Sequence, residues 1–395
     1  MIELKFTSWK KSWSAESRTP SLRVAIPLAV IVMAMTFFGL TMLYSTSFGF
    51  GAGEKMFLKQ SLWAGISVVA AAAVYLFGYR RCLRLSYPLL AAGAVLLLVA
   101  LFSPEKKGAH RWIPLLFGAN IQPSELAKLA VALCLARYAA LRPRGGRQFA
   151  EAQWLALAAV GGVIALVLAG RDLGTTVLLV MTVGGVLFAA GIRLRYLLPL
   201  PLMAPVVVVC IKWLSPVRWD RIVSFLEPEK YQQDIAYQLW NSILALGSGN
   251  WLGLGFTQSR MKALYLPEAH TDFIVAIVGE ELGLMAILAL MGGYVLIFIF
   301  GLLISVRAAD RPGMLLGFGL TLLLTMQAMI NLGVVSGALP TKGMPAPLLS
   351  YGGSNLVMSF IAIGLLLSIA MDPGAVAEDA VPSGRQLRLG MDPSA

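Results

Sequence analysis

Residues 264–274 read Leu-Tyr-Leu-Pro-Glu-Ala-His-Thr-Asp-Phe-Ile, and they lead into an apolar run that continues to residue 304. This run is longer than the roughly 20 residues that a helix needs to cross a bilayer. Asp272 stands where the polar segment meets the run. A carboxylate at a membrane boundary is costly to desolvate, which makes it a candidate functional group. The stretch therefore predicts a membrane-spanning helix with Asp272 at its start.

The composition extends this prediction to the whole chain. Hydrophobic residues make up 58% of the 395 residues and charged residues only 13%, and the mean hydropathy is +0.77. Only helices and closed barrels satisfy every backbone group in lipid, and long uncharged runs lack the alternating pattern of a barrel strand. The sequence predicts an all-α, polytopic membrane protein.

Apolar runs of spanning length predict about ten transmembrane helices. They lie at 24–47, 57–78, 85–102, 122–141, 152–170, 172–191, 196–214, 271–304, 313–337 and 353–371. The break between the fifth and sixth, Gly170-Arg171-Asp172, is the shortest.

The basic residues predict the orientation. They are more frequent in one set of short loops, which places both termini in the cytoplasm and explains the net charge of +12 without nucleic acid. We expect a basic cytoplasmic tail at 1–23, a transmembrane domain at 24–371 and a disordered cytoplasmic tail at 372–395. The longest connection, about 215–270, then lies outside the cell.

This long loop contains two recognisable pieces. The amphipathic run Tyr231–Leu246 predicts a short helix lying on the membrane surface, followed by a turn at Gly247–Gly255. A phosphate-binding glycine loop is the alternative for the turn, but no strand precedes it, so glycine spacing alone is weak support.

Two polar clusters precede helices on the predicted outer side. Glu125 and Lys128 follow Pro123 and share one helix face, so they form either a structural ion pair near the helix dipole or part of a binding cavity with Arg111. Asp172 stands at the start of a predicted helix and is expected to be its N-terminal cap.

A third cluster surrounds Asp272. Glu280 and Glu281 lie about 12 Å further along the helix, where we expect a structural hydrogen-bond network. His270 is expected to orient the loop rather than bind metal, because the chain has only two histidines. The three cysteines are far apart and suggest neither disulfides nor a metal cluster.

The segment 339–354 is the most distinctive. Three prolines and three glycines between two predicted helices indicate ordered, non-helical backbone, which is tolerated at membrane depth only where it lines a cavity. Lys342, Ser350 and Ser354 would face that cavity. Cations on the outer side suit an anionic lipid headgroup, with pyrophosphate as the candidate; they are Arg111, Lys128, Arg171, Arg218, Arg260, Lys262 and Lys342.

These segments resemble the SEDS family (shape, elongation, division and sporulation). The resemblance covers nearly all the spans and is carried by Tyr265-Leu-Pro-Glu-Ala-His-Thr-Asp-Phe-Ile, Gly279-Glu-Glu-Leu-Gly, Leu339-Pro-Thr-Lys-Gly and Leu349-Ser-Tyr-Gly-Gly-Ser. The Pro-Glu-Ala-His-Thr-Asp and Thr-Lys-Gly versions look like the FtsW branch, which acts in division, rather than the RodA branch, which acts in elongation.

The resemblance implies a peptidoglycan glycosyltransferase that polymerises lipid II outside the cytoplasmic membrane. It implies a class B penicillin-binding protein and other division proteins as partners, and a place at the division septum. The family's essential aspartate matches Asp272, and its cavity-lining residues match Lys342, Glu125 and Lys128. Arg171 stands where the family usually has proline, and Leu264 where FtsW proteins often carry an acid, which puts a metal site there in doubt.

The chemistry needs few protein groups. The donor already carries a good leaving group, undecaprenyl pyrophosphate, so no general acid is strictly required. One base, Asp272, would take the proton from the acceptor 4-hydroxyl, and cations would stabilise the leaving pyrophosphate with or without Mg²⁺ or Mn²⁺.

Other functions fit the same fold. A lipid II flippase would need intramembrane charges along a path between both faces, whereas these motifs gather at one face. A RodA-type elongation polymerase is distinguished from the FtsW type only by the exact residues in these motifs. A non-catalytic scaffold for division proteins would leave the acid and lysine residues unexplained.

Overall fold

The structure is a computed structural model that describes eight stretches of the chain. They are residues 22–47, 53–104, 111–114, 120–140, 151–192, 216–263, 266–341 and 343–372.

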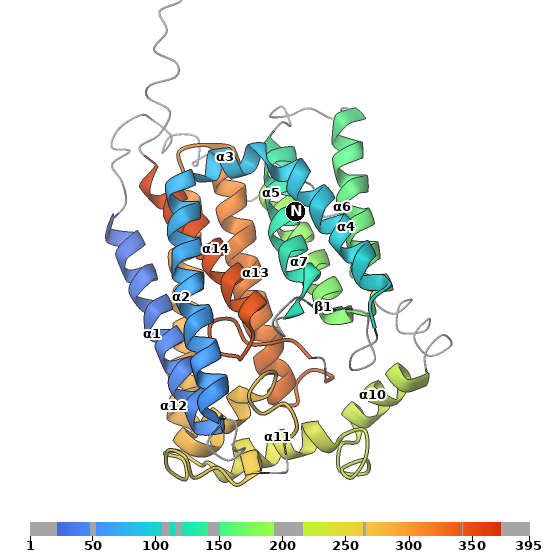
Figure 1. Ribbon diagram of the computed structural model, residues 1–395, viewed down its shortest axis with the longest axis vertical. Helices are drawn as coiled ribbons and strands as arrows, with labels where there is room; N and C mark the ends of the chain where they lie inside the picture. Colours follow the sequence, from blue (N-terminus) through green and yellow to red (C-terminus); the bar gives the residue numbers. More distant parts are fainter. Residues whose placement is uncertain are drawn as a thin grey trace, which may run out of the picture.

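Long helices form the body of the protein and run side by side (Figure 1). Helices form at nine of the ten ranges predicted to span the membrane, with ends within four residues of the predicted ones. The seventh predicted span, 196–214, lies outside the described residues, as do both predicted tails apart from residues 22, 23 and 372. The helices are α1 Leu22–Ser47, α2 Gly53–Phe77, α4 Ser86–Leu101, α5 Pro123–Ala140, α6 Glu151–Ala169, α7 Leu173–Ala189, α12 Ile274–Val306, α13 Arg311–Val335 and α14 Gly353–Met371.

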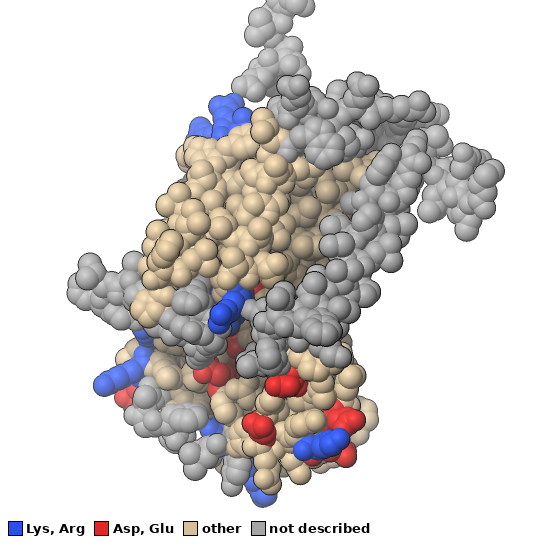
Figure 2. All heavy atoms as spheres, turned by 90° about the vertical axis from the view of Figure 1, so that its right-hand side faces the viewer, with Lys and Arg blue, Asp and Glu red and all other residues tan. Residues whose placement is uncertain are grey.

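Five of these helices, α1, α2, α12, α13 and α14, are long and apolar enough to cross a membrane. α4 and α7 are shorter apolar helices, as is the part of α6 from Leu155 to Ala169. α5 spans 18 residues but carries Glu125, Lys128 and Arg137. Figure 2 shows the result on one face: a broad band of the described surface carries no charged side chains, Lys and Arg lie at its upper edge, and both acidic and basic side chains gather at the lower end. The chain is a helical membrane protein.

Smaller elements lie at the two ends of this bundle (Figure 1). At one end is α3, Tyr79–Arg84, and at the other are α10, Pro216–Leu226, and α11, Tyr237–Ser248. The short 3-10 helix η4 spans Met261–Ala263. A two-residue antiparallel ladder pairs β1, Ile113–Pro114, with β2, Asn120–Ile121, and is the only strand pairing among the described residues.

α13 lies at the centre and contacts α5, α7, α12 and α14. Small residues let these helices approach closely, since lipid supplies no hydrophobic force between them. A Cβ on Gly301 of α12 would lie 2.3 Å from the Thr321 hydroxyl of α13, and one on Gly364 of α14 would lie 2.5 Å from the Ala71 carbonyl of α2. The bundle therefore depends on glycine at helix contacts.

A helix in the long loop is confirmed as α11, although it begins at Tyr237 rather than at Tyr231. Its place on the membrane surface stays a prediction. The glycine-rich turn after it has a structural role: its residues 250–255 insert into the hydrogen-bond ladder of α12. The amides of Leu254 and Gly255 donate to the Glu280 and Glu281 carbonyls at 2.9 and 3.0 Å.

In an unbroken helix those two carbonyls would accept from residues 284 and 285. The amides of Leu284 and Met285 instead donate to the Asn250 and Trp251 carbonyls of the turn, at 2.9 and 3.3 Å. α12 is consequently kinked at Gly283, whose φ of 75° and ψ of −173° are not helical. The predicted single helix therefore consists of two helical pieces that meet at Gly283, and the turn 250–255 supplies the hydrogen bonds that are missing at the kink.

A polar cluster ties helices together at the α3 end. The Tyr79 hydroxyl lies 3.0 Å from Asp310 Oδ2 and 2.7 Å from Asp372 Oδ2, and Arg80 pairs with both carboxylates. Burial of the Tyr79 phenol and the nearby Asp310 charge raise the Tyr79 pKa. The Asp310 side chain also caps α13 by accepting from the Gly313 amide.

Candidate functional site

Asp272 lies in the turn that precedes α12, and its side chain is half-buried. Its carboxylate packs against the segment after α13: a Cβ added to Gly343 would lie 2.7 Å from Asp272 Oδ2. The Asp272 carbonyl accepts a hydrogen bond from Asn331 Nδ2 of α13 at 2.8 Å. The acid is thus held between the start of one helix and the loop that follows another.

This second loop, described at 336–341 and 343–352, is non-helical, as predicted. It is joined to the Asp272 turn by the Tyr351 amide, which donates to the His270 carbonyl at 2.9 Å. The rings of these two residues meet edge to face with centroids 5.8 Å apart. His270 therefore orients the loop, as predicted, and burial raises the pKa of the Tyr351 phenol.

Glu125 and Lys128 form a buried ion pair in the first turn of α5. The Lys128 ammonium lies 2.8 Å from Glu125 Oε2, and both side chains are less than a tenth exposed. Lys128 also donates to Gln327 Oε1 of α13 at 2.6 Å. Gln327 Nε2 in turn donates to the Pro345 carbonyl at 2.9 Å and to Asn355 Oδ1 at 3.0 Å. The pair is connected to the loop beside Asp272 by side chains of α13 and α14.

Asp172 is the N-terminal cap of α7, as predicted: its side chain accepts from the Thr175 amide at 3.2 Å. Its other oxygen accepts from Ser124 and Gln122 at the start of α5, at 3.2 and 3.3 Å. Arg111 NH1 lies 3.6 Å from Asp172 Oδ1. Arg171, the residue before it, has φ of 63°, a backbone conformation that proline cannot adopt.

The Asp272 turn, the Glu125–Lys128 pair and the start of α7 at Asp172 are all connected to the dipeptide Met344-Pro345. Met344 packs on Gly174, where a Cβ would lie 2.7 Å from its Cγ, and its carbonyl accepts from Asn331 at 2.7 Å. Pro345 offers its carbonyl to Gln327, as above. We call this arrangement the dipeptide hub; it comprises Asp272, Gly343, Met344, Pro345, Gln327 and Asn331.

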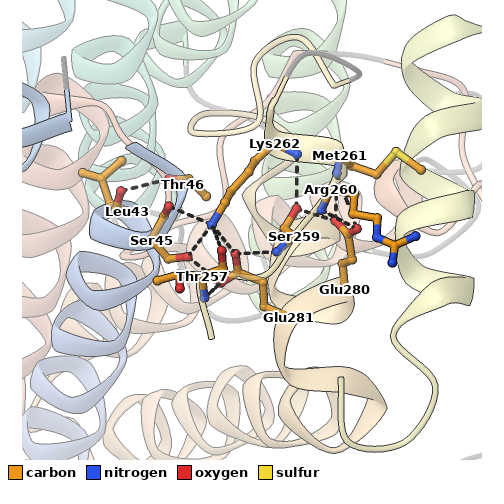
Figure 3. A network of polar contacts seen from close by, with 10 residues as sticks. All are labelled: Leu43, Ser45, Thr46, Thr257, Ser259, Arg260, Met261, Lys262, Glu280 and Glu281. Atoms are coloured by element: carbon orange, nitrogen blue, oxygen red, sulfur yellow. Dashed lines mark hydrogen bonds and ion pairs between the residues drawn. The ribbon is translucent and has the colours of Figure 1, made fainter. Parts of the chain in front are cut away.

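Glu280 and Glu281 form the structural hydrogen-bond network that was predicted (Figure 3). Glu280 accepts from the Ser259 hydroxyl and, at 2.9 Å, from the Arg260 amide. Glu281 pairs with Lys262 at 2.8 Å and accepts from the Ser45 hydroxyl of α1. Both carboxylates are at most 1% exposed. Their role is to hold the long loop and α1 against α12.

Lys262 is therefore in a different place from the one we predicted. Its ammonium is not turned toward a headgroup cavity: it donates to Glu281, to Ser45 and to the Thr257 carbonyl, and it is 6% exposed. The physical reason is that the buried Glu281 charge needs a cation. Arg260 contributes its backbone amide to the same network, and its side chain is exposed.

The remaining predicted residues divide into three. Ser350 is buried, and its hydroxyl oxygen accepts from the Ala346 amide at 2.8 Å, so it braces the loop from within. Ser354, at the start of α14, donates to the Asn120 carbonyl at 3.3 Å. Lys342 and the side chain of Arg218 lie outside the described part of the chain.

The hub amides Gln327 and Asn331, and also Asn355, were not predicted as site residues. The signal was present: Gln327 and Asn331 are four residues apart on an apolar helix, where polar residues facing the bundle interior are uncommon and functional. Among the described residues, no three His, Cys, Asp or Glu side chains come together as a group that could hold a metal ion.

The sequence profile of the cell cycle proteins FtsW, RodA and SpoVE matches residues 26–373. A probable peptidoglycan glycosyltransferase FtsW of Geobacter sp. (strain M18) is 36% identical, over 87% of this chain and 96% of the relative. One from Alkalilimnicola ehrlichii is 35% identical, over 91% of this chain and 92% of the relative.

Solved structures share the fold. A chain of a peptidoglycan synthase complex that coordinates polymerization and crosslinking superposes with a TM-score of 0.74 at 27% identity, covering 88% of this chain and 97% of that one. The rod shape determining protein RodA of Thermus thermophilus gives a TM-score of 0.65 at 26% identity, covering 92% and 99%. The protein described here therefore belongs to the FtsW, RodA and SpoVE family of cell cycle proteins.

Proposed function

We propose that this protein is a peptidoglycan glycosyltransferase that polymerises lipid II, with Asp272 as the general base. The relatives that support this activity are named peptidoglycan glycosyltransferases and align with most of the chain. The observation that carries the site is the hub: a half-buried carboxylate next to an ordered, non-helical loop at one end of a membrane bundle. Such backbone is tolerated in a membrane only where protein or water surrounds it.

The reaction follows from these groups. Asp272 takes the proton from the 4-hydroxyl of the acceptor sugar as its oxygen attacks the anomeric carbon of the donor. The bond from that carbon to undecaprenyl pyrophosphate breaks, and the electron pair leaves with the pyrophosphate. Attack from the face opposite the leaving group inverts the α-linked donor to a β-linked product.

Cations near the hub would stabilise the charge on the leaving pyrophosphate. Arg111 is the described candidate, because it is about one-fifth exposed and pairs with Asp172, which caps the helix that packs on Met344 of the hub at Gly174. Lys128 is held by Glu125 and Gln327, so its contribution would be indirect. Lys342, next to Gly343 in the chain, is the other cation that we propose. Mg²⁺ or Mn²⁺ bound to the pyrophosphate of the donor is a separate proposal, which EDTA treatment and add-back would test.

The partner and location are also proposals. The solved complex that combines polymerization with crosslinking supports a class B penicillin-binding protein as the crosslinking partner. We propose a place among the division proteins at the septum, which fits the FtsW-named relatives, in the cytoplasmic membrane. The proposed orientation, with the α11 end outside and both termini inside, rests on the basic residues of the short loops. Imaging a tagged copy, septal against lateral, tests the location.

The test of the catalytic assignment is Asp272→Asn, assayed for lipid II polymerisation in proteoliposomes. Asp220→Asn is the matched control, because Asp220 is an exposed acid of α10. We expect the Asp272 variant to insert normally and to form no glycan strands, whereas the control keeps the parental rate. Polymerisation by Asp272→Asn at the parental rate would overturn the assignment. A fluorescent-headgroup translocation assay in the same vesicles separates polymerisation from flipping.

A further inference from the structure

Asn331 is a buried amide near the C-terminal end of the hydrophobic helix α13. It lies one turn after Gln327 on α13 and is 2% exposed. Placing an amide there is costly unless its hydrogen bonds are made. The bonds that it makes are therefore informative about why the chain has asparagine at this position.

The amide nitrogen of Asn331 joins two separate loops. Nδ2 donates to the Asp272 carbonyl at 2.8 Å and to the Met344 carbonyl at 2.7 Å. The first carbonyl belongs to the turn before α12, and the second belongs to the loop after α13. Both hydrogens of the side-chain amide are used, and each fixes one side of the contact between Asp272 and Gly343.

The orientation of the amides in the hub is determined by charge. Lys128 can only donate, so the atom of Gln327 that faces it must be the oxygen, and Gln327 Nε2 must point to Pro345 and Asn355. Gln327 and Asn331 thus hold the consecutive carbonyls of Pro345 and Met344 from successive turns of one helix. The loop is attached to α13 at two adjacent points.

The oxygen of Asn331 makes no such contribution. Oδ1 is buried and has no hydrogen-bond partner within the described stretches. For packing alone, a leucine of similar size would avoid burying that unpaired acceptor. The two donors on Nδ2 are what leucine could not supply.

The contact between the Asp272 carboxylate and Gly343, which Asn331 fixes, leaves no room for a shift of either loop. A single methyl group on Gly343 would come within 2.7 Å of Asp272 Oδ2, so the carboxylate and the loop backbone are in direct contact. A shift of either loop would move the carboxylate relative to the loop that lines the proposed site. Displacements of about 1 Å in a catalytic geometry can lower a rate about a hundredfold.

We infer that Asn331 is a positioning residue for Asp272: by clamping the Asp272 and Met344 carbonyls together, it sets the place of the catalytic carboxylate against the 343–345 loop. This inference rests on the proposed function of Asp272. Asn331 acts through the backbone of these two residues and does not touch substrate.

The experiment compares three variants of the full-length chain, each co-purified with the class B penicillin-binding protein of the same genome. Asn331→Leu removes both donors and keeps the size. Asn331→Asp can donate one hydrogen bond when protonated and none when ionised. Thr325→Val is the control, because the Thr325 hydroxyl is also buried in α13 but, among the described residues, donates to the Thr321 carbonyl of its own helix at 2.8 Å and joins no loop.

We expect Asn331→Leu to lower kcat for lipid II polymerisation about a hundredfold, with KM changed less than about threefold. Asn331→Asp should be more active than Asn331→Leu at low pH, and this advantage should disappear as the pH rises and the carboxyl ionises. Thr325→Val should match the parent. Thermal unfolding of every variant, measured at both ends of the pH range, identifies losses that come from misfolding.

The outcomes separate the two ideas. A parental kcat in Asn331→Leu, or activities of the two Asn331 variants that stay in constant ratio across pH, overturns the positioning role. If Asn331→Leu does not fold, the activity of Asn331→Asp relative to the parent still decides: a ratio that stays constant across pH overturns the positioning role. Asp272→Asn, assayed in parallel, tests the proposed function itself: if it is inactive while Asn331→Leu has the parental kcat, only the positioning inference fails.

Discussion

Lys262 Nζ lies 2.8 Å from Glu281 Oε1, and both side chains are less than a tenth exposed. The pair joins the long loop to α12, and the Ser45 hydroxyl and carbonyl extend it to the end of α1 (Figure 3). Three segments that are far apart in the sequence thus meet at one buried charge pair. The pair thereby fixes the long loop before the Asp272 turn to the helix after it.

Lys262→Met should destabilise the protein by about 3–5 kcal/mol, because it leaves the Glu281 carboxylate buried without its cation. The double variant Lys262→Met with Glu281→Gln should recover much of that loss, since neither charge then remains. Thermal unfolding in detergent measures both. The contrasting pair is Lys230 with Glu227, which is exposed on both sides. Lys230→Met should leave the Tm unchanged, and an equal loss in both lysine variants would contradict the burial argument.

Gly343→Ala should lower polymerisation about a hundredfold without unfolding the protein, because the added methyl would displace the Asp272 carboxylate, 2.7 Å away. Gly65→Ala in α2 is the control, since a Cβ there meets nothing within 4 Å. The measurement is kcat at saturating lipid II, together with the Tm of each variant. Full activity in Gly343→Ala would mean that the carboxylate and the loop are not in functional contact.

The spans could be predicted from the sequence because hydropathy and length are nearly sufficient to define a helix in lipid, where every backbone group must be paired within its segment. The same physics located Asp272 and the ordered loop at 339–354. Asp172 could be assigned as a cap because a carboxylate in the residue before a helix can accept from the free amides of the first turn. Each of these depends on residues close together in the chain.

The rest depended on contacts between distant residues. Lys262 was expected near the headgroup because loop cations usually face water, but its ammonium pairs with the buried Glu281 carboxylate instead. The kink at Gly283 arises because the turn 250–255 takes over the carbonyls of α12, and no local pattern in either segment specifies that partner. Gln327 and Asn331 carried a readable spacing, but only the fold shows which carbonyls they hold.

Gly253→Ala should prevent the turn 250–255 from inserting into α12. Gly253 has φ of 81°, and an added Cβ would lie 2.1 Å from the Glu281 carbonyl oxygen, which is backbone and cannot move aside. Gly191→Ala separates the two causes, because Gly191 has φ of 87° with nothing within 4 Å of its Cβ position. It should cost only the left-handed strain, about 1–2 kcal/mol.

Hydrogen exchange at the amides of Leu254, Gly255, Leu284 and Met285 reads the insertion directly. Gly253→Ala should lose protection at all four, and Gly191→Ala should keep it. Protection that survives in Gly253→Ala would show that the turn tolerates a side chain, and the account of the kink would then be wrong.

The Glu125–Lys128 pair offers a test of whether it is structural or part of the reaction. Lys128→Met alone should cost about 3–5 kcal/mol of stability, because Glu125 is left as an unpaired buried charge. The double variant with Glu125→Gln removes both charges and should restore the Tm.

The activity of this double variant then decides, because a purely structural pair leaves polymerisation intact once stability returns. We expect activity to remain about tenfold or more below the parent, since Lys128 also orients Gln327 and, through it, the Pro345 carbonyl of the hub. Full activity in the stable double variant would confine the pair to a structural role.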